Sequence, residues 1–404
     1  MDKHGFYQEL QDMSARFEAM EPEVCETLKD DNEGIEGYVV VWNTGISVGG
    51  PLERMGKGGT RITPQTDVDE IKMLARIMAL KNAAAGLPLG GAKSGMKADS
   101  MAPEFEQDYR RFVELCRPLL FENGGVFGGF GFDIGARPEM PHWACDQLGS
   151  RKSFTGKPLD MGGTDYDKEG VAGLGVAVAA KTALEYDGKT ATGASFSVQG
   201  IGAMGAAIVK YFSDYGGQLK CVSDPRIGGT WVLSNDDMTG LVHAIGKGDV
   251  EKANEILPSV GEKISDDTQE ALYADVDVLF PAAVQDVIHM ENVSKIKASY
   301  ISEGANNLSS DAAWTWFHEN GVTVIPDFIA NPGGIIAAFV ELTSDVEPEE
   351  NVKTRANPER AKSLTIERIT DNVTQVMTLV RDFDVEPAHA GRYIAFKNIF
   401  KGEA

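Results

Sequence analysis

Three lysines in the first quarter of the chain lie in sequence surroundings that suit chemistry as well as solvation. Lys57 in MGKGGTR and Lys93 in LPLGGAKSG are flanked by glycines, where the backbone can fold closely around a small ligand. Lys81 falls near the end of a predicted helix, so its ammonium group can point into the same region. A lysine binds carboxylates, and a crowded or desolvated lysine has a lowered pKa and works as an acid or base. Solvated surface lysine, the competing interpretation, is the one we adopt for Lys72 and Lys97.

Asp133 is an acid in the glycine-rich, otherwise apolar segment GGFGFDIGARPEM. Most aspartates in such segments form turns through bonds to their own backbone. A proton shuttle in a dry cleft is the alternative, and the residues alone do not choose between the two. The surrounding charge is unusual as well, because Arg54–Lys97 holds eight basic and three acidic residues in a chain with a net charge of −23. This basic island suggests an anion site, although a solvated helix face would give the same pattern.

The segment GIGAMG at residues 200–205 follows the pattern G-x-G-x-x-G. The pattern is weak alone, but here a buried strand, SFSVQ, precedes it and an amphipathic helix follows it. Gly200 would make the tight turn, Gly202 would admit a pyrophosphate, and Gly205 would let the helix pack on the strand. Ala203 and Met204 open the helix, whose free N–H groups and partial positive charge favour phosphate. A dinucleotide site is therefore predicted; a similar fold that binds no nucleotide is the alternative.

Two charged residues after the next strand bear on the choice of dinucleotide. Asp224 ends that strand near the distance expected for a carboxylate that binds the adenosine ribose hydroxyls. A carboxylate there repels a 2′-phosphate, which favours NAD. Arg226 can bind that phosphate instead, so NADP stays open.

The pattern of the chain predicts an α/β protein of two domains with a cleft between them. Residues to about 36, including EVCETLKDD, are expected to be helical, followed by a β-run in EGYVVVWNTG. Apolar spacing predicts a helix from Val68 to Ala85, with Thr66 or Asp67 as its N-cap. The segment GLPLGGAKSGM that follows is too rich in glycine for regular structure to be expected.

The second half alternates strand and helix, which indicates a parallel sheet with helices on both faces. After a helix in VAGLGVAVAAKTALEY, strands are expected in SFSVQ, VDVLFPAA, ASYISEGAN and VTVIPDFIA. We therefore predict a substrate-binding and oligomerisation domain over 1–160 and a Rossmann domain over 161–335. A C-terminal helical segment, 336–404, is expected to pack back on the first domain, with a solvated loop at DVEPEE.

Composition excludes several classes of function. The chain has 404 residues, 38 basic against 61 acidic, so nucleic acids and anionic membranes are unfavourable partners. No apolar run reaches membrane-spanning length and MDKHGFYQEL has no signal-peptide core, which favours the cytoplasm. The cysteines are widely spaced and the histidines form no metal-binding pair, so neither a disulfide framework nor a metal site is predicted.

At this point the residues carry a resemblance to a known family. The run KGGTRITPQTDVDEIKMLARIMALKNAAAGLPLGGAKSG resembles the substrate-domain signature of the glutamate/leucine/phenylalanine/valine dehydrogenases. The similarity continues, in family order, through FDIGARPEM, FTGKPLDMGG, GIGAMG, PAAVQDVI, SEGANN and IPDFIANPGG. It covers about residues 50–340. The resemblance implies an NAD(P)-dependent amino acid dehydrogenase that releases a 2-oxo acid and ammonia.

The resemblance also implies a role for each candidate residue. Lys81 would hold the substrate α-carboxylate, Lys93 would be the catalytic lysine, and Asp133 would shuttle protons. Lys57 would pair with a distal carboxylate, as in members specific for glutamate. Two asparagines would lie beside the nicotinamide, namely Asn306 and Asn331. Family members assemble as closed homo-oligomers, most commonly hexamers.

The chain departs from the glutamate pattern at two positions. Ala338 stands where glutamate-type members carry a serine that assists Lys57, and Ala172 replaces a threonine expected near the nicotinamide amide. Because a buried lysine without a carboxylate partner is costly, glutamate is the favoured substrate. A branched-chain or other apolar amino acid is the alternative within enzymes. A catalytically silent dinucleotide-binding regulatory subunit is the alternative outside them.

Overall fold

The computed structural model describes residues 1–234, 237–344 and 356–401, and the chain divides into two compact units. Unit 1 comprises Met1–Tyr7, Tyr166–Gly334 and Lys362–Arg392; unit 2 comprises Gln8–Asp165, Ile335–Ala361 and Tyr393–Ala404. The predicted divisions lie at 160 and 335, whereas the units divide after Asp165 and after Gly334, and Lys362–Arg392 belongs to unit 1. The roles assigned to the three stretches stay predictions, and DVEPEE lies outside the described residues.

Unit 2 is built on a five-stranded sheet. Its strands are β1 (Val24–Asp30), β2 (Ile35–Trp42), β3 (Gly56–Lys57), β4 (Thr60–Thr63) and β5 (Gly90–Lys97). The order is β1-β2-β5-β3, and β4 also pairs with β5. Strand β2 runs antiparallel to both neighbours, whereas β3 and β4 run parallel to β5. Strand β5, which carries Lys93, therefore pairs with β2, β3 and β4, and β3 carries Lys57.

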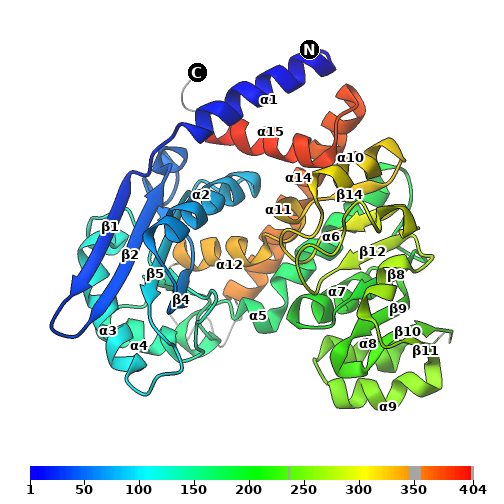
Figure 1. Ribbon diagram of the computed structural model, residues 1–404, viewed down its shortest axis with the longest axis horizontal. Helices are drawn as coiled ribbons and strands as arrows, with labels where there is room; N and C mark the ends of the chain where they lie inside the picture. The colour runs from blue at the N-terminus through cyan, green and yellow to red at the C-terminus, as the bar shows by residue number, and fades with distance from the viewer. Residues whose placement is uncertain (235–236, 345–355, 402–404) are drawn as a thin grey trace. The chain divides into compact units, whose positions relative to one another are not determined.

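Helices lie on both faces of this sheet (Figure 1). The described helices assigned wholly or mostly to unit 2 are α1 (Lys3–Glu18), α2 (Val68–Ala84), α3 (Phe105–Cys116), α4 (Met140–Leu148) and α12 (Gly333–Leu342). A short parallel pair, β6 (Phe130–Gly131) and β7 (Phe154–Thr155), completes the unit. The predicted helix α2 is confirmed, and Asp67 caps it by accepting a bond from the backbone of Glu70.

Two predictions about local structure are wrong. Residues Val24–Asp30 form a strand and not a helix, because pairing with β2 along their whole length outweighs their local helical composition. The glycine-rich segment after α2 contains strand β5. A Cβ atom on Gly91 would lie 2.2 Å from the Ala75 carbonyl oxygen, and one on Gly95 would lie 2.4 Å from Ile71. These glycines let α2 pack directly on β5, so their role here is to allow close helix–strand packing.

Unit 1 contains a seven-stranded sheet. Its strands are β8 (Ser195–Gln199), β9 (Gln218–Asp224), β10 (Gly229–Leu233), β11 (Gly261–Ser265), β12 (Val278–Pro281), β13 (Tyr300–Ser302) and β14 (Thr323–Ile325). The order is β11-β10-β9-β8-β12-β13-β14. Strands β9, β8, β12, β13 and β14 are parallel, as predicted, and β10 and β11 add an antiparallel edge. The order changes direction at β8, which is where nucleotide sites form in open parallel sheets.

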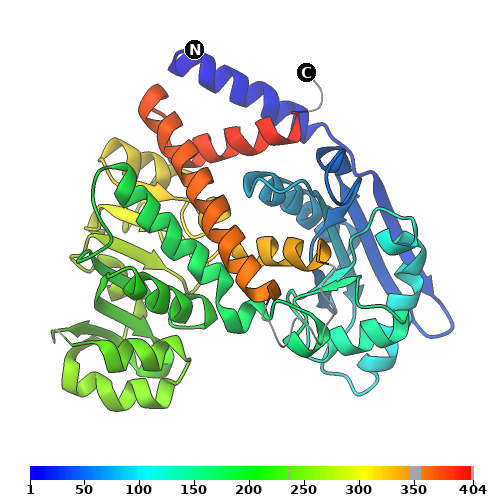
Figure 2. The same ribbon diagram turned by 180° about the vertical axis from the view of Figure 1, so that it is seen from behind.

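Helices cover both faces of this sheet too. The described helices assigned wholly or mostly to unit 1 are α5 (Tyr166–Glu169), α6 (Val171–Tyr186), α7 (Ala203–Asp214), α8 (Thr239–Gly246), α9 (Val250–Val260), α10 (Asp311–Glu319), α11 (Asp327–Ala330) and α14 (Ala356–Phe383). Helix α15 (Pro387–Ile399) is divided between the two units, with the division after Arg392. Helices α6 and α7 pack on one face, and α10 packs on the other against an apolar cluster that includes Leu279 and Ile301. Helix α14 runs beside α6, where Tyr186 donates a hydrogen bond to Thr378 (Figure 2).

Candidate active site

The residues expected to do acid–base chemistry meet in unit 2. The Lys93 ammonium on β5 lies 2.5 Å from the Asp133 carboxylate, and their side chains are 7% and 18% exposed. Arg61 on β4 donates to the same carboxylate oxygen at 3.3 Å. On its other side Arg61 pairs with Glu70 of α2 at 2.5 Å. The four side chains form a row of alternating charge, Glu70, Arg61, Asp133 and Lys93, with the cation of Lys93 at the most buried end.

Opposing effects set the pKa values in this row. Burial by itself would raise the pKa of Asp133, but the Lys93 ammonium, its hydrogen bond and the Arg61 guanidinium outweigh burial and leave the pKa lowered. Burial lowers the pKa of Lys93, which Asp133 offsets only in part and Arg61 reinforces. Asp133 is therefore ionised at neutral pH, and Lys93 gives up its proton more readily than an exposed lysine does.

Lys57 is held differently from the other candidates. Its ammonium is buried and donates to three backbone carbonyl oxygens, those of Gly58, Gly129 and Phe130, at 2.8, 2.9 and 2.7 Å. These three bonds use all the N–H groups that an ammonium has. Burial lowers the pKa of Lys57 to about 7, and the cations of Lys157 and Lys93 act in the same direction, while Glu341 opposes them. The side chain thus joins β3 to β6 as well as placing a cation in the interior.

Glycines next to Lys57 create this arrangement. A Cβ atom on Gly58 would lie 1.7 Å from the carbonyl oxygen of Ala92, and one on Gly59 would lie 2.6 Å from that of Phe132. No side chain fits at either position. The KGG sequence therefore allows the chain to pass between β5 and the segment that carries Asp133.

A second buried ion pair in unit 2 acts electrostatically on Lys57. Glu341, on α12, has a side chain 1% exposed and pairs with the Lys157 ammonium at 2.8 Å. The same carboxylate accepts bonds from the Thr164 hydroxyl and from the backbone N–H groups of Thr164 and Gly156. Ala338 is buried one helical turn earlier on α12. This carboxylate is fully satisfied locally, so it fixes the loop at 156–164 against α12.

Some of these residues were missed from the sequence, and one expectation stays untested. Arg61, Lys157 and Glu341 were not singled out from their sequence surroundings. The signal available for Lys157 was the glycine directly before it, which resembles the glycines close to Lys93. Lys81 lies in the last turn of α2, partly exposed, on the helix that packs against β5. Its convergence with Lys57 and Lys93 on one ligand stays a prediction.

The glycine turn in unit 1 has the geometry that its motif predicts. Gly200 has a φ of +87°, and a Cβ atom on Gly205 would lie 1.8 Å from the Gly200 carbonyl oxygen. A Cβ atom on Gly202 would meet nothing within 4 Å, so the space above that residue is open. The N-cap of α7 is Gly202, which makes no side-chain capping bond, and Ala203 and Met204 form the first turn. The first N–H groups of α7 are therefore not taken by a capping side chain.

Asp224 and Arg226 are joined to each other after β9. Arg226 donates to the Asp224 carboxylate from its backbone, its Nε and its Nη2, at 2.9, 2.8 and 3.1 Å. Asp224 also accepts from the backbone of Ile201 in the glycine turn, at 2.9 Å. Burial would raise the pKa of Asp224, but the bonds from Arg226 outweigh it and lower the pKa. The Asp224 carboxylate therefore contacts the glycine turn, and its charge is balanced by the Arg226 guanidinium, whose side chain is 51% exposed.

The two asparagines also lie together. The Asn331 amide donates to the Asn306 side-chain oxygen and to the Gly304 carbonyl oxygen, both at 3.0 Å. Asn331 is 8% exposed, and its own side-chain oxygen is buried without a hydrogen-bond partner in the described part of the chain. A buried acceptor without a donor costs free energy. This orphan oxygen fits a ligand that brings an N–H group, as a carboxamide does.

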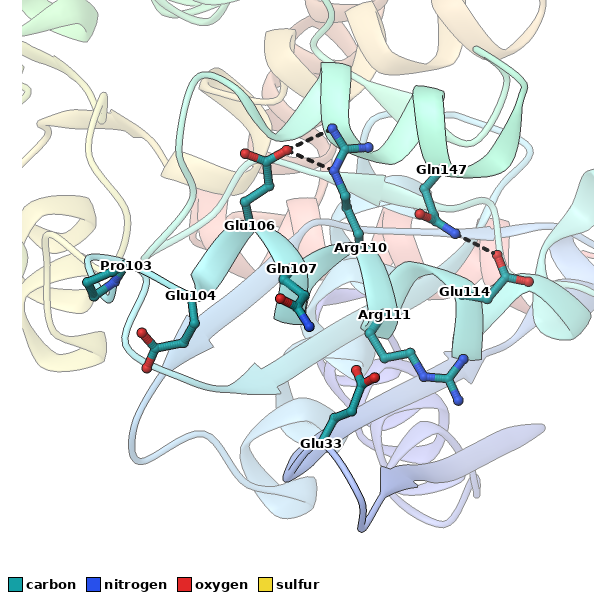
Figure 3. Close-up of a pocket in the computed structure, with 9 residues that line it drawn as sticks. All are labelled: Glu33, Pro103, Glu104, Glu106, Gln107, Arg110, Arg111, Glu114 and Gln147. Atoms are coloured by element: carbon teal, nitrogen blue, oxygen red, sulfur yellow. Dashed lines mark hydrogen bonds and ion pairs between the residues drawn. The ribbon is translucent and has the colours of Figure 1, made fainter.

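Other features of the described residues lie apart from these sites. A hollow of about 520 Å³ on unit 2 is lined by polar side chains of α3 and its neighbours, where Glu106 pairs with Arg110 and Gln147 donates to Glu114 (Figure 3). It contains none of the candidate residues. Within the described ranges, acidic, histidine and cysteine side chains form no group of three that would hold a metal ion. Over the same ranges, helices both long and apolar enough to span a bilayer are absent.

Comparison with known proteins decides the family. The model for Glutamate/Leucine/Phenylalanine/Valine dehydrogenase matches residues 162–403, and that for the Glu/Leu/Phe/Val dehydrogenase dimerisation domain matches residues 23–148. The chain belongs to this family of dehydrogenases. It is an amino acid dehydrogenase, and its cofactor is a nicotinamide dinucleotide.

Individual dehydrogenases resemble the chain over most of its length. The NADP(+)-dependent glutamate dehydrogenase of Pyrobaculum calidifontis is 32% identical over 79% of this chain and 76% of its own. The glutamate dehydrogenase of Aeropyrum pernix is 33% identical over 78% and 74%. The crystal structure of glutamate dehydrogenase from Peptoniphilus asaccharolyticus superposes with a TM-score of 0.74 at 22% identity, covering 100% of this chain and 99% of that one. At that identity the structural likeness shows the dehydrogenase fold alone.

Proposed function

We propose that this dehydrogenase oxidatively deaminates L-glutamate to the 2-oxo acid and ammonia, reversibly, with NAD or NADP. The observation that carries the proposal is the buried Lys93–Asp133 pair, 2.5 Å apart, in the same unit as the buried Lys57 ammonium, whose pKa the Lys93 cation helps to lower. Relatives that are 32–33% identical are glutamate dehydrogenases, which supports the same substrate class.

Lys93 and Asp133 divide the proton transfers in this proposal. Lys93 polarises the C=N bond of the imine and the C=O bond of the 2-oxo acid. It also activates the water that hydrolyses the imine. Asp133, ionised and 2.5 Å from Lys93, accepts the proton from the substrate amino group and returns it to ammonia. Burial lowers the pKa of Lys93, so this lysine gives up its proton more readily than an exposed one. Lys81 holds the α-carboxylate in this scheme.

The residues of unit 1 fit the nicotinamide dinucleotide. Gly200, Gly202 and Gly205, with the first turn of α7, would hold the pyrophosphate, and the orphan oxygen of Asn331 would accept a bond from the carboxamide. When bound, the nicotinamide supplies the hydride acceptor for Cα. Asp224 and Arg226 would meet the adenosine ribose. Because Arg226 neutralises Asp224 and is half exposed, we propose that both NAD and NADP are accepted.

A second candidate substrate is an apolar amino acid, and one observation favours it. All three Lys57 N–H groups are directed at backbone carbonyl oxygens, and Ala338 presents a methyl group where a hydroxyl would assist a distal carboxylate. Glutamate would have to replace one of those carbonyl contacts with its own carboxylate. An apolar side chain would leave the three contacts as they are.

One set of assays separates the two substrates. Cofactor reduction is measured with all twenty amino acids, with NAD and with NADP, for the wild type and for Lys57→Met. If Lys57 binds the distal carboxylate, kcat/KM for glutamate falls about tenfold to a hundredfold in the variant while apolar substrates hold or improve. Unchanged glutamate turnover in a folded variant rules out that role for Lys57. Turnover of no amino acid would favour a silent dinucleotide-binding subunit.

The pH dependence gives an independent check on the glutamate assignment. With a pKa of about 7, Lys57 loses its charge as the pH rises above neutrality. The KM for glutamate should therefore rise by about tenfold per pH unit above that value, while the KM of an apolar substrate should not. A flat profile for glutamate up to pH 9 would show that Lys57 does not carry the charge contact.

We also propose that the protein works as a homo-oligomer, a hexamer by preference. Residues 23–148 match the family's dimerisation domain, and β1 is an edge strand of its sheet, with one side unpaired in the described chain. Light scattering coupled to size exclusion gives the mass directly, and a monomer at micromolar concentration would rule the proposal out.

A further inference from the structure

A buried carboxyl group with no part in the proposed chemistry lies where β13 and β14 end. Glu303 directly follows β13 and is 0% exposed. Its carboxyl group accepts hydrogen bonds from the Trp314 indole N–H and from the backbone N–H of Asp327, both at 3.1 Å. The Glu303 backbone is itself bonded to Ile325 of β14. One side chain therefore joins both strand ends to helix α10.

Asp327, at the start of α11, extends these contacts to the asparagine loop. Its carboxylate accepts from the backbone N–H of Asn307 at 2.8 Å and from that of Phe328 at 2.6 Å. Its carbonyl oxygen accepts from the backbone of Asn331 at 2.8 Å. Asn307 has a φ of +51°, a left-handed conformation that a non-glycine residue adopts only when its surroundings enforce it. The bond to Asp327 is one such constraint.

The surroundings of Glu303 favour the neutral form of its carboxyl group. Burial raises the pKa of Glu303 to about 8, and the Asp327 carboxylate acts in the same direction. Among the described residues, Asp327 is the charged group that acts on Glu303; its other contacts are the Trp314 indole and Ser309. Glu303 is thus protonated below pH 8. Ionising both would place two negative charges in one apolar site.

We propose that Glu303 and Asp327 are positioning residues that hold Asn306 and Asn331 in the conformation that receives the nicotinamide carboxamide. The chain of contacts is continuous: Glu303 holds the Asp327 backbone, Asp327 holds the backbones of Asn307 and Asn331, and Asn331 bonds to Asn306 and Gly304. Its end point is the orphan oxygen of Asn331, which has no hydrogen-bond partner among the described residues. The inference rests on the dinucleotide binding of the proposed function.

Binding of two ligands to the apoprotein tests the inference without an activity assay. NADH carries the nicotinamide, and ADP-ribose carries all the rest; the 2′-phosphorylated pair replaces them if NADPH binds more tightly. In Glu303→Ala the Kd of NADH should rise about tenfold or more, because the bonds of Asp327 and Trp314 are lost, while that of ADP-ribose changes less than about threefold. Glu386→Gln is the control, since Glu386 is buried in the same unit and contacts α10 through Thr315.

Glu303→Gln provides a second test that does not depend on the alanine variant folding. The amide keeps an acceptor for Trp314 or Asp327 and cannot ionise. The wild type should lose NADH affinity as the pH rises through about 8, because ionised Glu303 repels Asp327, whereas Glu303→Gln should keep its affinity to pH 9.5.

The outcomes separate this inference from the proposed function. A wild type that binds neither NADH nor ADP-ribose overturns the proposed function, and the inference with it. A Glu303→Ala variant that loses both ligands equally, or neither, overturns the inference alone. Identical pH profiles of NADH affinity for the wild type and Glu303→Gln overturn it as well.

Discussion

Replacing Arg61 by methionine tests the charge row at the candidate site most directly. Arg61 donates to Asp133 at 3.3 Å, and two unit charges at that distance attract by about 5 kcal/mol at an effective dielectric constant of about 20. Glu70, 2.5 Å from the same guanidinium, cancels much of that field. About 1–3 kcal/mol remains, which corresponds to about 1–2 units in the pKa of Asp133.

The sign of the effect follows from the direction of the present shift. The cations hold the pKa of Asp133 below its usual value, so removing one of them raises it. Asp133 must be ionised to accept a proton from the substrate. The acid limb of kcat/KM for oxidative deamination should therefore move up by about 1–2 pH units in Arg61→Met, with the rate above pH 8 changed far less.

The assay is a pH profile of initial rates from pH 4 to 10, with circular dichroism recorded at each pH to exclude unfolding. Arg61→Lys keeps a cation and should stay closer to the wild type. Glu70→Gln removes the outer anion and should move the limb slightly in the acid direction. An acid limb in Arg61→Met that stays within about 0.3 unit of the wild type would refute the reasoning.

Three further results are expected. Lys93→Ala should lower kcat by about 10²–10⁴-fold while the cofactor Kd, measured by fluorescence, stays unchanged; wild-type turnover would exclude Lys93 from the chemistry. Arg226→Met should raise the KM of NADP about tenfold or more and that of NAD much less, because Asp224 without its guanidinium partner repels a 2′-phosphate. Equal changes in both KM values would show that Asp224 and Arg226 do not set the choice of cofactor. Glu341→Gln should lower the free energy of unfolding by about 3–5 kcal/mol in urea titrations, because Lys157 is left buried without its counter-ion; a loss below 1 kcal/mol would contradict that assignment.

Local sequence was sufficient wherever the structural signal was short in range. The helix from Val68 with its Asp67 cap, the strand before Gly200 and the glycine turn itself are all found where the pattern placed them. Each depends on spacing, capping or backbone conformation within about one turn of chain.

Contacts between neighbouring elements produced the errors. Strand β1 reads as helical on its own and becomes a strand only because β2 pairs with it. The glycine content of β5 predicts a loop. In the structure these glycines are needed because α2 packs so close to the strand that a Cβ atom would not fit. In both cases the deciding partner is a neighbouring element of the chain, and its contacts form only when the tertiary structure brings the two elements together.

The same division applies to the site. The sequence by itself determined which residue types carry the chemistry, because ammonium groups next to glycines and a glycine turn between strand and helix have intrinsic chemical meaning. Only the tertiary structure decided the charge of those groups and their hydrogen-bond partners. Lys57 donates its three N–H groups to carbonyl oxygens, Arg61 donates to Asp133, and Arg226 donates to Asp224. A pKa and a free hydrogen-bond donor depend on burial and on neighbours brought in from distant parts of the chain, and neither is a property of the local sequence.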